Sequence, residues 1–222
     1  MTGWAPCHDA PMRVDHVSFA AEPAGLQATA QRLGEAIGVQ PVDGGVHPRF
    51  GTRNMILPLA DDRYIEVVEV LDHPASDKAP FGQVVRARSE AGGGWMGWVI
   101  AVDDLAEVEG RLGREAVEGC RKLADGRSFS WRQIGIKGTQ ADPQLPFFVK
   151  WDEGSDHPSH EGDDEVSIES LLIAGDPDRV LDWLGLTEAP TGTGIDYSFV
   201  APHGTPGLLS VTLRTPNGSV TI

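Results

Sequence analysis

Residues 15–23 read Asp15-His16-Val17-Ser18-Phe19-Ala20-Ala21-Glu22-Pro23. A short run of apolar and β-favouring residues ends here at an acidic residue that can cap a helix, so the stretch predicts a strand that leads into a helix. The same pattern recurs in Gly97-Trp98-Val99-Ile100-Ala101-Val102-Asp103-Asp104 and in Glu169-Ser170-Leu171-Leu172-Ile173-Ala174-Gly175-Asp176-Pro177. Three such starts predict an internal repeat of roughly 70 to 80 residues, longer than the repeats of solenoid proteins.

The residues after the first start complete one structural unit. An apolar stripe at Leu26, Ala30, Leu33 and Ile37 predicts a helix that Gly38 can end. Three strands are expected next, near residues 39–42, 54–59 and 63–70, with turns at Asp43-Gly44-Gly45 and Asp61-Asp62. The order is therefore βαβββ, and the helix should cover one face of the sheet.

Two further units follow the same plan. The second has a helix stripe at Leu105, Val108 and Leu112 and candidate strands near residues 114–117, 128–135 and 146–151. The third is abbreviated, with a helix at 177–184 and strands near 197–200, 208–214 and 219–222, the last two joined by an Asn217-Gly218 hairpin turn. The sequence thus predicts an α+β fold built from repeated βαβββ modules.

These elements divide the chain into six parts. We expect an N-terminal leader at 1–12, a first module at 13–71, a connecting segment at 72–94 with a helix near 80–90, a second module at 95–153, an acidic linker at 154–165 and the third, abbreviated unit at 166–222. The linker is expected to be solvated because most of its charge is acidic. On the same ground His157 and His160 are expected to face solvent, and a catalytic pair at Cys7-His8 is not expected in a Pro-flanked leader.

Composition narrows the classes of function. The chain has 222 residues, 40% hydrophobic and 23% charged, as in an ordinary globular protein. A formal net charge of −15 would repel a phosphate backbone, so no nucleic-acid partner is expected. Two cysteines without CxxC spacing and the lack of a signal-peptide pattern indicate a cytoplasmic protein. No apolar stretch approaches the roughly 20 residues that span a bilayer, so no membrane partner is expected.

Alternation along two strands brings ionisable side chains together. Residues two apart in a strand share a face. If Val17 and Phe19 meet the helix, His16 points to the opposite face; if Ile65 and Val67 meet it, Glu66 and Tyr64 point the same way as His16. His16 and Glu66 are therefore predicted on one face of the sheet.

Several short motifs carry a family resemblance. Val14-Asp15-His16-Val17, then Gly44-Gly45-Val46-His47-Pro48 with Gly51-Thr52-Arg53-Asn54, then Tyr64-Ile65-Glu66-Val67-Val68 resemble the glyoxalase-like branch of the vicinal-oxygen-chelate superfamily. The match is best over residues 13–71, and Ser130-Trp131-Arg132 with Leu145-Pro146-Phe147-Phe148-Val149-Lys150-Trp151 resembles the later part of that branch. The resemblance implies paired modules that curve into a cup with helices on its outer face. It also implies a divalent metal held by His or Glu from the first and fourth strands of both modules.

The metal ligands implied by the resemblance are incomplete here. His16 and Glu66 match two of the positions, but the repeat sets Trp98 against His16 and Lys150, or an apolar neighbour, against Glu66. Neither Trp nor protonated Lys ligates a metal. His47 could be a third ligand, giving a two-His, one-carboxylate site of the kind that holds non-haem iron, with Zn, Ni or Mn as other candidates. The alternative is that His16 and Glu66 form an acid–base pair without metal.

Other residues suit a ligand in the cup. His47 is expected to ligate, to act as a base, or to cap a turn. The predicted substrate-binding residues are Asn54, Tyr64, Trp98, Arg127, Trp131 and Phe148. Arg127, Trp131 and Arg132 would offer cations and an aromatic wall to an anionic or aromatic ligand, or else be edge-strand charges that prevent sheet pairing.

Together, the motifs and the placement of the ionisable residues favour a small-molecule enzyme that acts through His16, Glu66 and His47. The expected reaction classes are lyase, isomerase and dioxygenase. The alternative is a protein of the same fold that binds or sequesters a small molecule without turnover, because the large aromatic Trp98 suggests stacking. A third hypothesis is a purely structural interaction module. The modules can pair within one chain, so a monomer and a homodimer are both compatible with the sequence.

Overall fold

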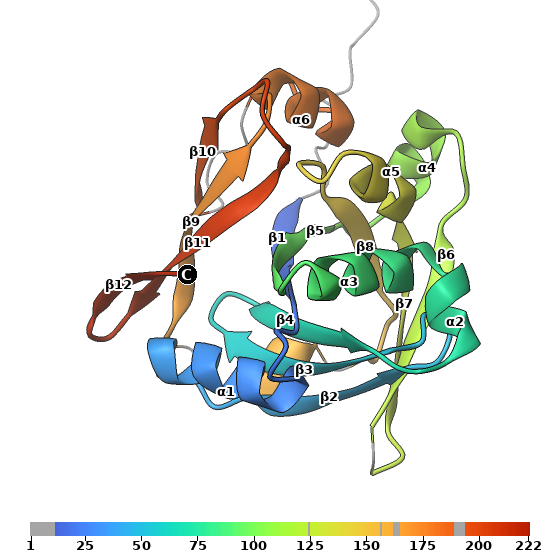
Figure 1. Cartoon of the computed structure of the whole chain (residues 1–222). Coiled ribbons are helices and arrows are strands. Elements are labelled where there is room, and N and C mark those ends of the chain that lie inside the picture. Colours follow the sequence, from blue (N-terminus) through green and yellow to red (C-terminus); the bar gives the residue numbers. More distant parts are fainter. Residues whose placement is uncertain (1–11, 124, 156, 162–164, 189–193) are drawn as a thin grey trace, which may run out of the picture.

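Two βαβββ modules close an eight-stranded barrel (Figure 1). The computed structural model describes residues 12–123, 125–155, 157–161, 165–188 and 194–222. The first module comprises β1 (Arg13–Ala20), α1 (Leu26–Ile37), β2 (Val42–His47), β3 (Thr52–Leu59) and β4 (Arg63–Val70). The second comprises β5 (Gly94–Ala101), α4 (Ala106–Leu112), β6 (Val117–Lys122), β7 (Ser128–Ile134), α5 (Ile136–Ala141) and β8 (Phe147–Trp151). The strand order is β1-β4-β3-β2-β6-β7-β8-β5, so each module contributes one half of the barrel wall.

The two halves meet at two antiparallel seams. At one seam β1 pairs with β5 along its length, with bulges in the register. At the other seam β2 pairs with β6 through Val46 and Lys122. Gly45, whose φ is +89°, makes this approach feasible, because a Cβ there would lie 2.3 Å from the carbonyl oxygen of Lys122. The second seam therefore depends on the absence of a side chain in β2.

Helices cover the barrel on both sides. The apolar stripe of α1, which includes Leu26 and Leu33, packs outside the barrel against Leu57 and Ile65, and Gly38 ends the helix in the left-handed conformation. Between the modules lie α2 (Pro74–Lys78) and α3 (Pro80–Glu90). Phe81 and Val85 of α3 pack in one cluster with Val99, Phe147 and Val149 of the barrel strands. This helix therefore covers one opening of the barrel, whose interior we call the cup (Figure 1).

The C-terminal part of the chain forms a separate four-stranded sheet. The short helix η1 (Pro158–Glu161) precedes this sheet. The elements that follow are β9 (Ser167–Ala174), α6 (Pro177–Leu184), β10 (Asp196–Val200), β11 (Gly207–Thr215) and β12 (Gly218–Thr221). The strand order is β10-β9-β11-β12, which differs from the order within each barrel module. The sheet packs outside the second module, where Trp95 Nε1 donates to the carbonyl oxygen of Ile222 at 2.9 Å and the Trp98 ring lies 5.8 Å from that of Tyr197.

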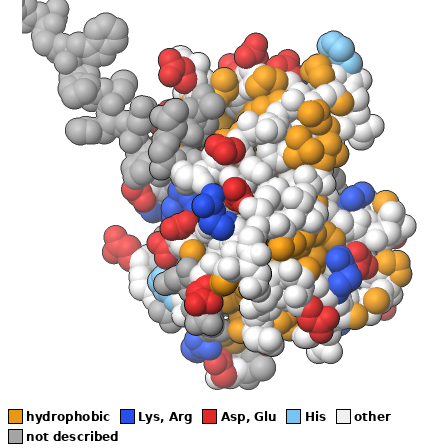
Figure 2. Space-filling model, turned by 90° about the vertical axis from the view of Figure 1, so that its left-hand side faces the viewer, with side chains coloured by type: hydrophobic (Ala, Val, Ile, Leu, Met, Phe, Trp, Pro, Cys, Tyr) orange, Lys and Arg blue, Asp and Glu red, His pale blue; other side chains and the backbone are white. Residues whose placement is uncertain are grey.

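Charge is not gathered on the face of the molecule that carries α1 and the C-terminal sheet. Figure 2 shows acidic and basic side chains interspersed there with patches of hydrophobic surface. Within the described residues, no helix is long and apolar enough to cross a membrane.

Several sequence expectations need correction. The Asp43-Gly44-Gly45 run is not a turn but part of β2, because its glycines serve close strand approach. The first strand of the second module after its helix lies at Val117–Lys122 rather than at 114–117. Helix α1 is preceded by Gly25 without a side-chain cap, whereas Asp176 caps α6 as expected. The Cys7-His8 pair lies outside the described residues.

The segment expected as a solvated acidic linker is in part an ordered lid on the barrel. Residues 158–161 form η1, which contacts β3 and β4. The side chains of His157 and Ser159 are buried, while His160 is exposed, as expected, and lies 3.2 Å from Asp62. The aromatic and hydrogen-bonding partners of His157 outweigh the acidic character of its neighbours in sequence.

We predict that Gly45→Ala destabilises the protein far more than Gly38→Ala does. Both glycines have positive φ, but a Cβ at Gly38 would meet nothing within 4 Å. Gly38→Ala should therefore cost about 1 to 2 kcal/mol for the left-handed backbone alone, and Gly45→Ala at least about 2 kcal/mol more, because it also opens the β2–β6 seam. Denaturant unfolding measures both values, and equal losses would show that this seam does not need close approach.

Candidate functional site

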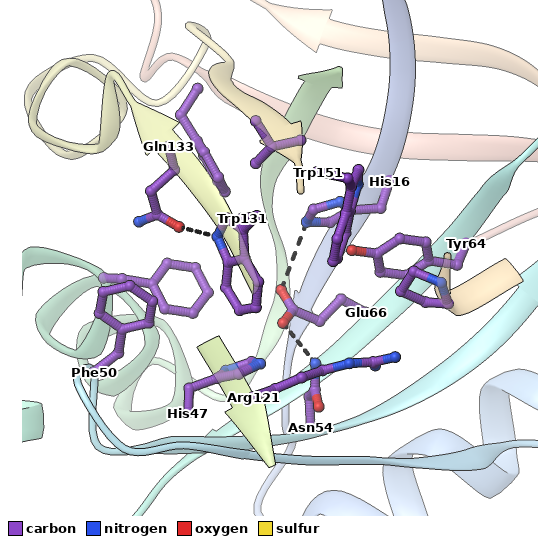
Figure 3. Close-up of a pocket in the computed structure, with 14 residues that line it drawn as sticks. His16, His47, Phe50, Asn54, Tyr64, Glu66, Arg121, Trp131, Gln133 and Trp151 are labelled. Atoms are coloured by element: carbon purple, nitrogen blue, oxygen red, sulfur yellow. Dashed lines mark hydrogen bonds and ion pairs between the residues drawn. The ribbon is translucent and has the colours of Figure 1, made fainter. Parts of the chain in front are cut away.

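A small cavity lies inside the barrel beneath α3 and η1 (Figure 3). Its volume is about 30 Å³, which is room for roughly two water molecules. Polar and aromatic side chains from both modules line it.

A β-bulge in β1 turns the side chain of Asp15 to the same face of the strand as that of His16. The register against β5 shifts between Val14 and His16, so Asp15 is the extra residue. Strict alternation would have turned Asp15 toward the outer layer. Instead its Oδ2 lies 2.8 Å from His16 Nδ1, and since an ionised carboxylate can only accept, Nδ1 donates and Nε2 is left facing the cavity.

Asp15 is a fully buried carboxylate held by several donors. Trp151 Nε1 and His157 Nε2 each lie 3.1 Å from its Oδ1, and Arg13 lies 3.3 Å away. Burial by itself would raise the pKa of Asp15, but the hydrogen bonds from His157 and His16 outweigh it and hold that pKa well below its usual range. Asp15 is therefore ionised whenever the protein is folded near neutral pH.

Glu66 of β4 faces His16 across the cavity. Its Oε2 lies 3.9 Å from His16 Nε2 and accepts a hydrogen bond of 2.9 Å from Ser18 Oγ. Its Oε1 accepts one of 2.8 Å from Asn54 Nδ2. Both oxygens accept from neutral donors, so the carboxylate is fixed in position with its charge directed into the cup (Figure 3).

The ring of Tyr64 forms the floor beside His16. The two rings stack with centroids 4.4 Å apart. Burial raises the pKa of Tyr64 well above its ordinary value, and the charges of Asp15 and Glu66 act in the same direction. The phenol therefore stays protonated and can donate a hydrogen bond but not act as a base.

His47 lies on the other side of the cavity, at the end of β2. Its Nδ1 is 3.0 Å from Thr52 Oγ1, and its ring meets the edge of Trp131 at 5.7 Å. Burial lowers the pKa of His47 to about 4, helped by Arg121 and opposed by Glu66. His47 is therefore a neutral imidazole at physiological pH.

The second module contributes no metal ligands at the corresponding positions. β1 and β4 pair His16 with Tyr64 and Ser18 with Glu66; β5 and β8 pair Val99 with Phe147 and Ala101 with Val149 in the same way. Val99 therefore takes the place of His16, which corrects the expected match of Trp98, and Val149 takes that of Glu66, so the apolar neighbour of Lys150 rather than Lys150 itself is the match. Trp98 pairs with Val17 and, like Val17, belongs to the cluster outside the barrel.

The donor set does not fit the metal site that the resemblance implies. That site takes ligands from both modules, and here the second half of the cup offers two valines. The part of the chain that the structure describes holds no group of three His, Cys, Asp or Glu side chains suited to one ion. His16 and Glu66 are engaged with each other, with Asp15, with Ser18 and with Asn54 instead.

The remaining predicted ligand residues divide into two groups. Asn54, Tyr64 and Trp131 line the cavity. Trp98 is buried outside the barrel and donates to the carbonyl oxygen of Gln144 at 3.0 Å, and Phe148 is buried in the same outer cluster. Arg127 and Arg132 pair with Asp125 and Glu109 at the surface.

Other cavity residues were not identified from the sequence. Asp15, Phe50, Phe81, Arg121, Gln133, Phe147 and Trp151 lie at or beside the cup. Arg121 is the most consequential, because its guanidinium is buried and stacks on Phe129 at 4.4 Å. In the sequence, Arg121 stands next to the exposed Lys122 and looks like an ordinary edge-strand charge. No local signal therefore marks it as a cavity residue.

Comparison with known proteins supports the fold. A family model described as a glyoxalase-like domain matches residues 14–187. A hypothetical protein from Staphylococcus aureus is 16% identical over 92% of this chain and 91% of its own, with a TM-score of 0.64. Methylmalonyl-CoA epimerase from Mycobacterium tuberculosis is 14% identical over 63% of this chain and 86% of its own, with a TM-score of 0.40. The chain therefore shares its fold with the Staphylococcus aureus protein. No curated protein sequence matches the chain.

We predict that His47 makes stability depend on pH between about 6.5 and 4. Its folded pKa lies below its unfolded value of 6.5, so the unfolded chain binds more protons in this window and the free energy of unfolding falls as the pH falls. The full loss is about 3 kcal/mol. Denaturant unfolding of the wild type and of His47→Asn, which can keep a hydrogen bond to Thr52, measures it. A slope that persists in the variant would assign it to other groups.

Proposed function

Because the chain belongs to the glyoxalase-like domain family of the vicinal-oxygen-chelate superfamily, we propose that its cup binds a small organic molecule and moves a proton on it through His16 and Glu66. The observation that carries the proposal is the juxtaposition of His16 Nε2 and Glu66 Oε2 at 3.9 Å inside a cavity lined largely by aromatic side chains, with one cation, Arg121. Two proton acceptors in a buried cup are an arrangement typical of acid–base catalysis.

Each group has a part in the proposed reaction. A substrate C–H bond next to a carbonyl group breaks, its proton passes to Glu66 or His16, and the electron pair moves to the carbonyl oxygen to form an enolate. The group that accepted the proton, or the second group after the proton has moved to it, then returns a proton to carbon, and the enolate becomes a carbonyl again. Asp15 acts as a positioning residue, because its hydrogen bond to Nδ1 keeps Nε2 of His16 turned toward the substrate.

A buried cation supports the enolate. Arg121 lines the cavity and would stabilise negative charge that develops on the carbonyl oxygen, where low polarity strengthens the attraction. The Tyr64 phenol, protonated for the reasons given above, is a second donor within the cup.

Among the reaction classes expected for the fold, this arrangement favours isomerases and lyases. Both begin with proton transfer next to a carbonyl, which the paired acceptors serve directly. A dioxygenase needs an iron site, and in the described part of the chain neither His47 nor another His, Cys, Asp or Glu joins His16 and Glu66 in a group suited to one ion, while valines occupy the two matching positions of the second module.

Binding without turnover is the second candidate, and a specific feature favours it. Phe50, Trp131, Phe147 and Trp151 surround the cavity, and the Trp131 and Trp151 rings lie 5.4 Å apart. The flat face of Trp131 fits against Gly119, where a Cβ would lie 2.3 Å from the ring. Such an aromatic enclosure could hold a planar ligand by stacking.

We predict that the protein catalyses exchange of a C–H proton with solvent. The experiment incubates it in D₂O with a panel of 2-oxo carboxylates and hydroxy ketones and follows the loss of the C–H signal by ¹H NMR. Exchange is expected for at least one compound, and Glu66→Gln should slow it by at least about 100-fold, because the carboxylate is lost as a base while the amide keeps its shape.

The matched control is Glu69→Gln. Glu69 lies on the same strand but pairs with Arg53 at the surface, so this variant should exchange at the wild-type rate. Exchange that survives Glu66→Gln, or no exchange with any compound, would contradict the proposal. Compounds that bind by calorimetry without exchanging would instead support the sequestering function.

A further inference from the structure

Phe81 stands where three cavities meet. Its side chain, on the first turn of α3, lines the acid–base cup, a second small cavity near Met96, and a larger groove at the outer surface. The cup and the groove share two further residues, Phe50 and Gln133. The Phe50 and Phe81 rings meet edge to face at 5.9 Å. These side chains are therefore the partition between the cup and the groove, and a change in the rotamer of Phe81 would join the two spaces.

The cup and the groove differ in volume by about tenfold. The cup has a volume of about 30 Å³, and the groove about 330 Å³. Pockets that hold small molecules in proteins usually measure about 300 to 1,000 Å³. The cup alone can hold only the reacting end of a ligand, whereas the cup and the groove together reach the size of an ordinary binding site.

The chemistry of the groove differs from that of the cup. Its walls include the apolar side chains of Pro80, Val117, Ile134 and Ile136, together with the charged residues Arg114, Glu115 and Lys137. Val117 is 52% exposed, one of few large hydrophobic side chains in the described residues left so open to water. An apolar chain laid over these residues would remove their hydrophobic surface from water, which is energetically favourable. A polar ligand would gain less from the same surface.

We propose that the ligand is an elongated molecule whose carbonyl end enters the cup and whose unbranched apolar tail lies in the groove between α3, the start of β6 and the β7–α5 connection. The proposal rests on the proposed function for the identity of the reacting end. The tail is assigned by the continuity of the two cavities through Phe50, Phe81 and Gln133. Phe81 acts as the gate and its ring packs against the tail once the tail is in place.

The test measures affinity against chain length. Calorimetric titration uses straight-chain 2-oxo carboxylates of four to ten carbons and the matching saturated carboxylates, which lack the 2-oxo group. Affinity is expected to rise by about fourfold for each methylene group that becomes buried, and to level off when the groove is full. Val117→Asp, which places a charge in the groove at an exposed position, should abolish the rise of affinity with chain length.

The control variant is Leu209→Asp, because Leu209 is 50% exposed on the separate C-terminal sheet. It should keep the full dependence on chain length. Affinity that does not change with length, a rise that persists in Val117→Asp, or no binding at any length would overturn the proposal. A rise in both series without proton exchange would support the groove and sink the proposed reaction, so the two failures are distinguishable.

Discussion

The buried carboxylate of Asp15 is the interaction on which the site depends. It accepts hydrogen bonds from His16, His157 and Trp151, and these residues come from three separate parts of the chain. One of its oxygens fixes the ring of His16, while the other accepts hydrogen bonds from Trp151 at the end of β8 and from His157 immediately before η1. A buried charge with too few donors would be strongly destabilising, so the order of the lid and the orientation of the imidazole are linked through a single side chain.

The sequence predicts the polar half of the cup well and the rest poorly, for identifiable reasons. Regular alternation in β1 and β4 is enough to put His16, Tyr64 and Glu66 on one face, where the structure has them. Asp15 escapes this reasoning because a bulge turns it to the face of its neighbour. In the run Phe147-Phe148-Val149, every residue is apolar, so alternation cannot tell which side faces inward; Phe147 and Val149 do.

Glycine is the other place where pattern and structure diverge. The run Asp43-Gly44-Gly45 has the composition of a turn, yet it lies within β2. A Cβ at Gly44 would lie 2.1 Å from Asn54 Oδ1, and one at Gly45 would meet β6. These glycines therefore let the barrel close and leave Asn54 free to position Glu66. Such a contact joins residues distant in sequence, so no local signal can reveal it.

The two modules share one architecture but differ in chemistry: the first gives the cup His16, His47 and Glu66, whereas the second gives it Arg121 and aromatic rings, with valines at the positions of His16 and Glu66. The central claim is that Asp15 holds His16 with its Nε2 free toward Glu66. Long-range ¹H–¹⁵N correlation of the imidazole resonances, assigned with His16→Gln, tests it directly. The proton should reside on Nδ1, and Glu66→Gln should shift the Nε2 resonance. A proton fixed on Nε2, or an Nε2 resonance that ignores Glu66→Gln, would contradict this account.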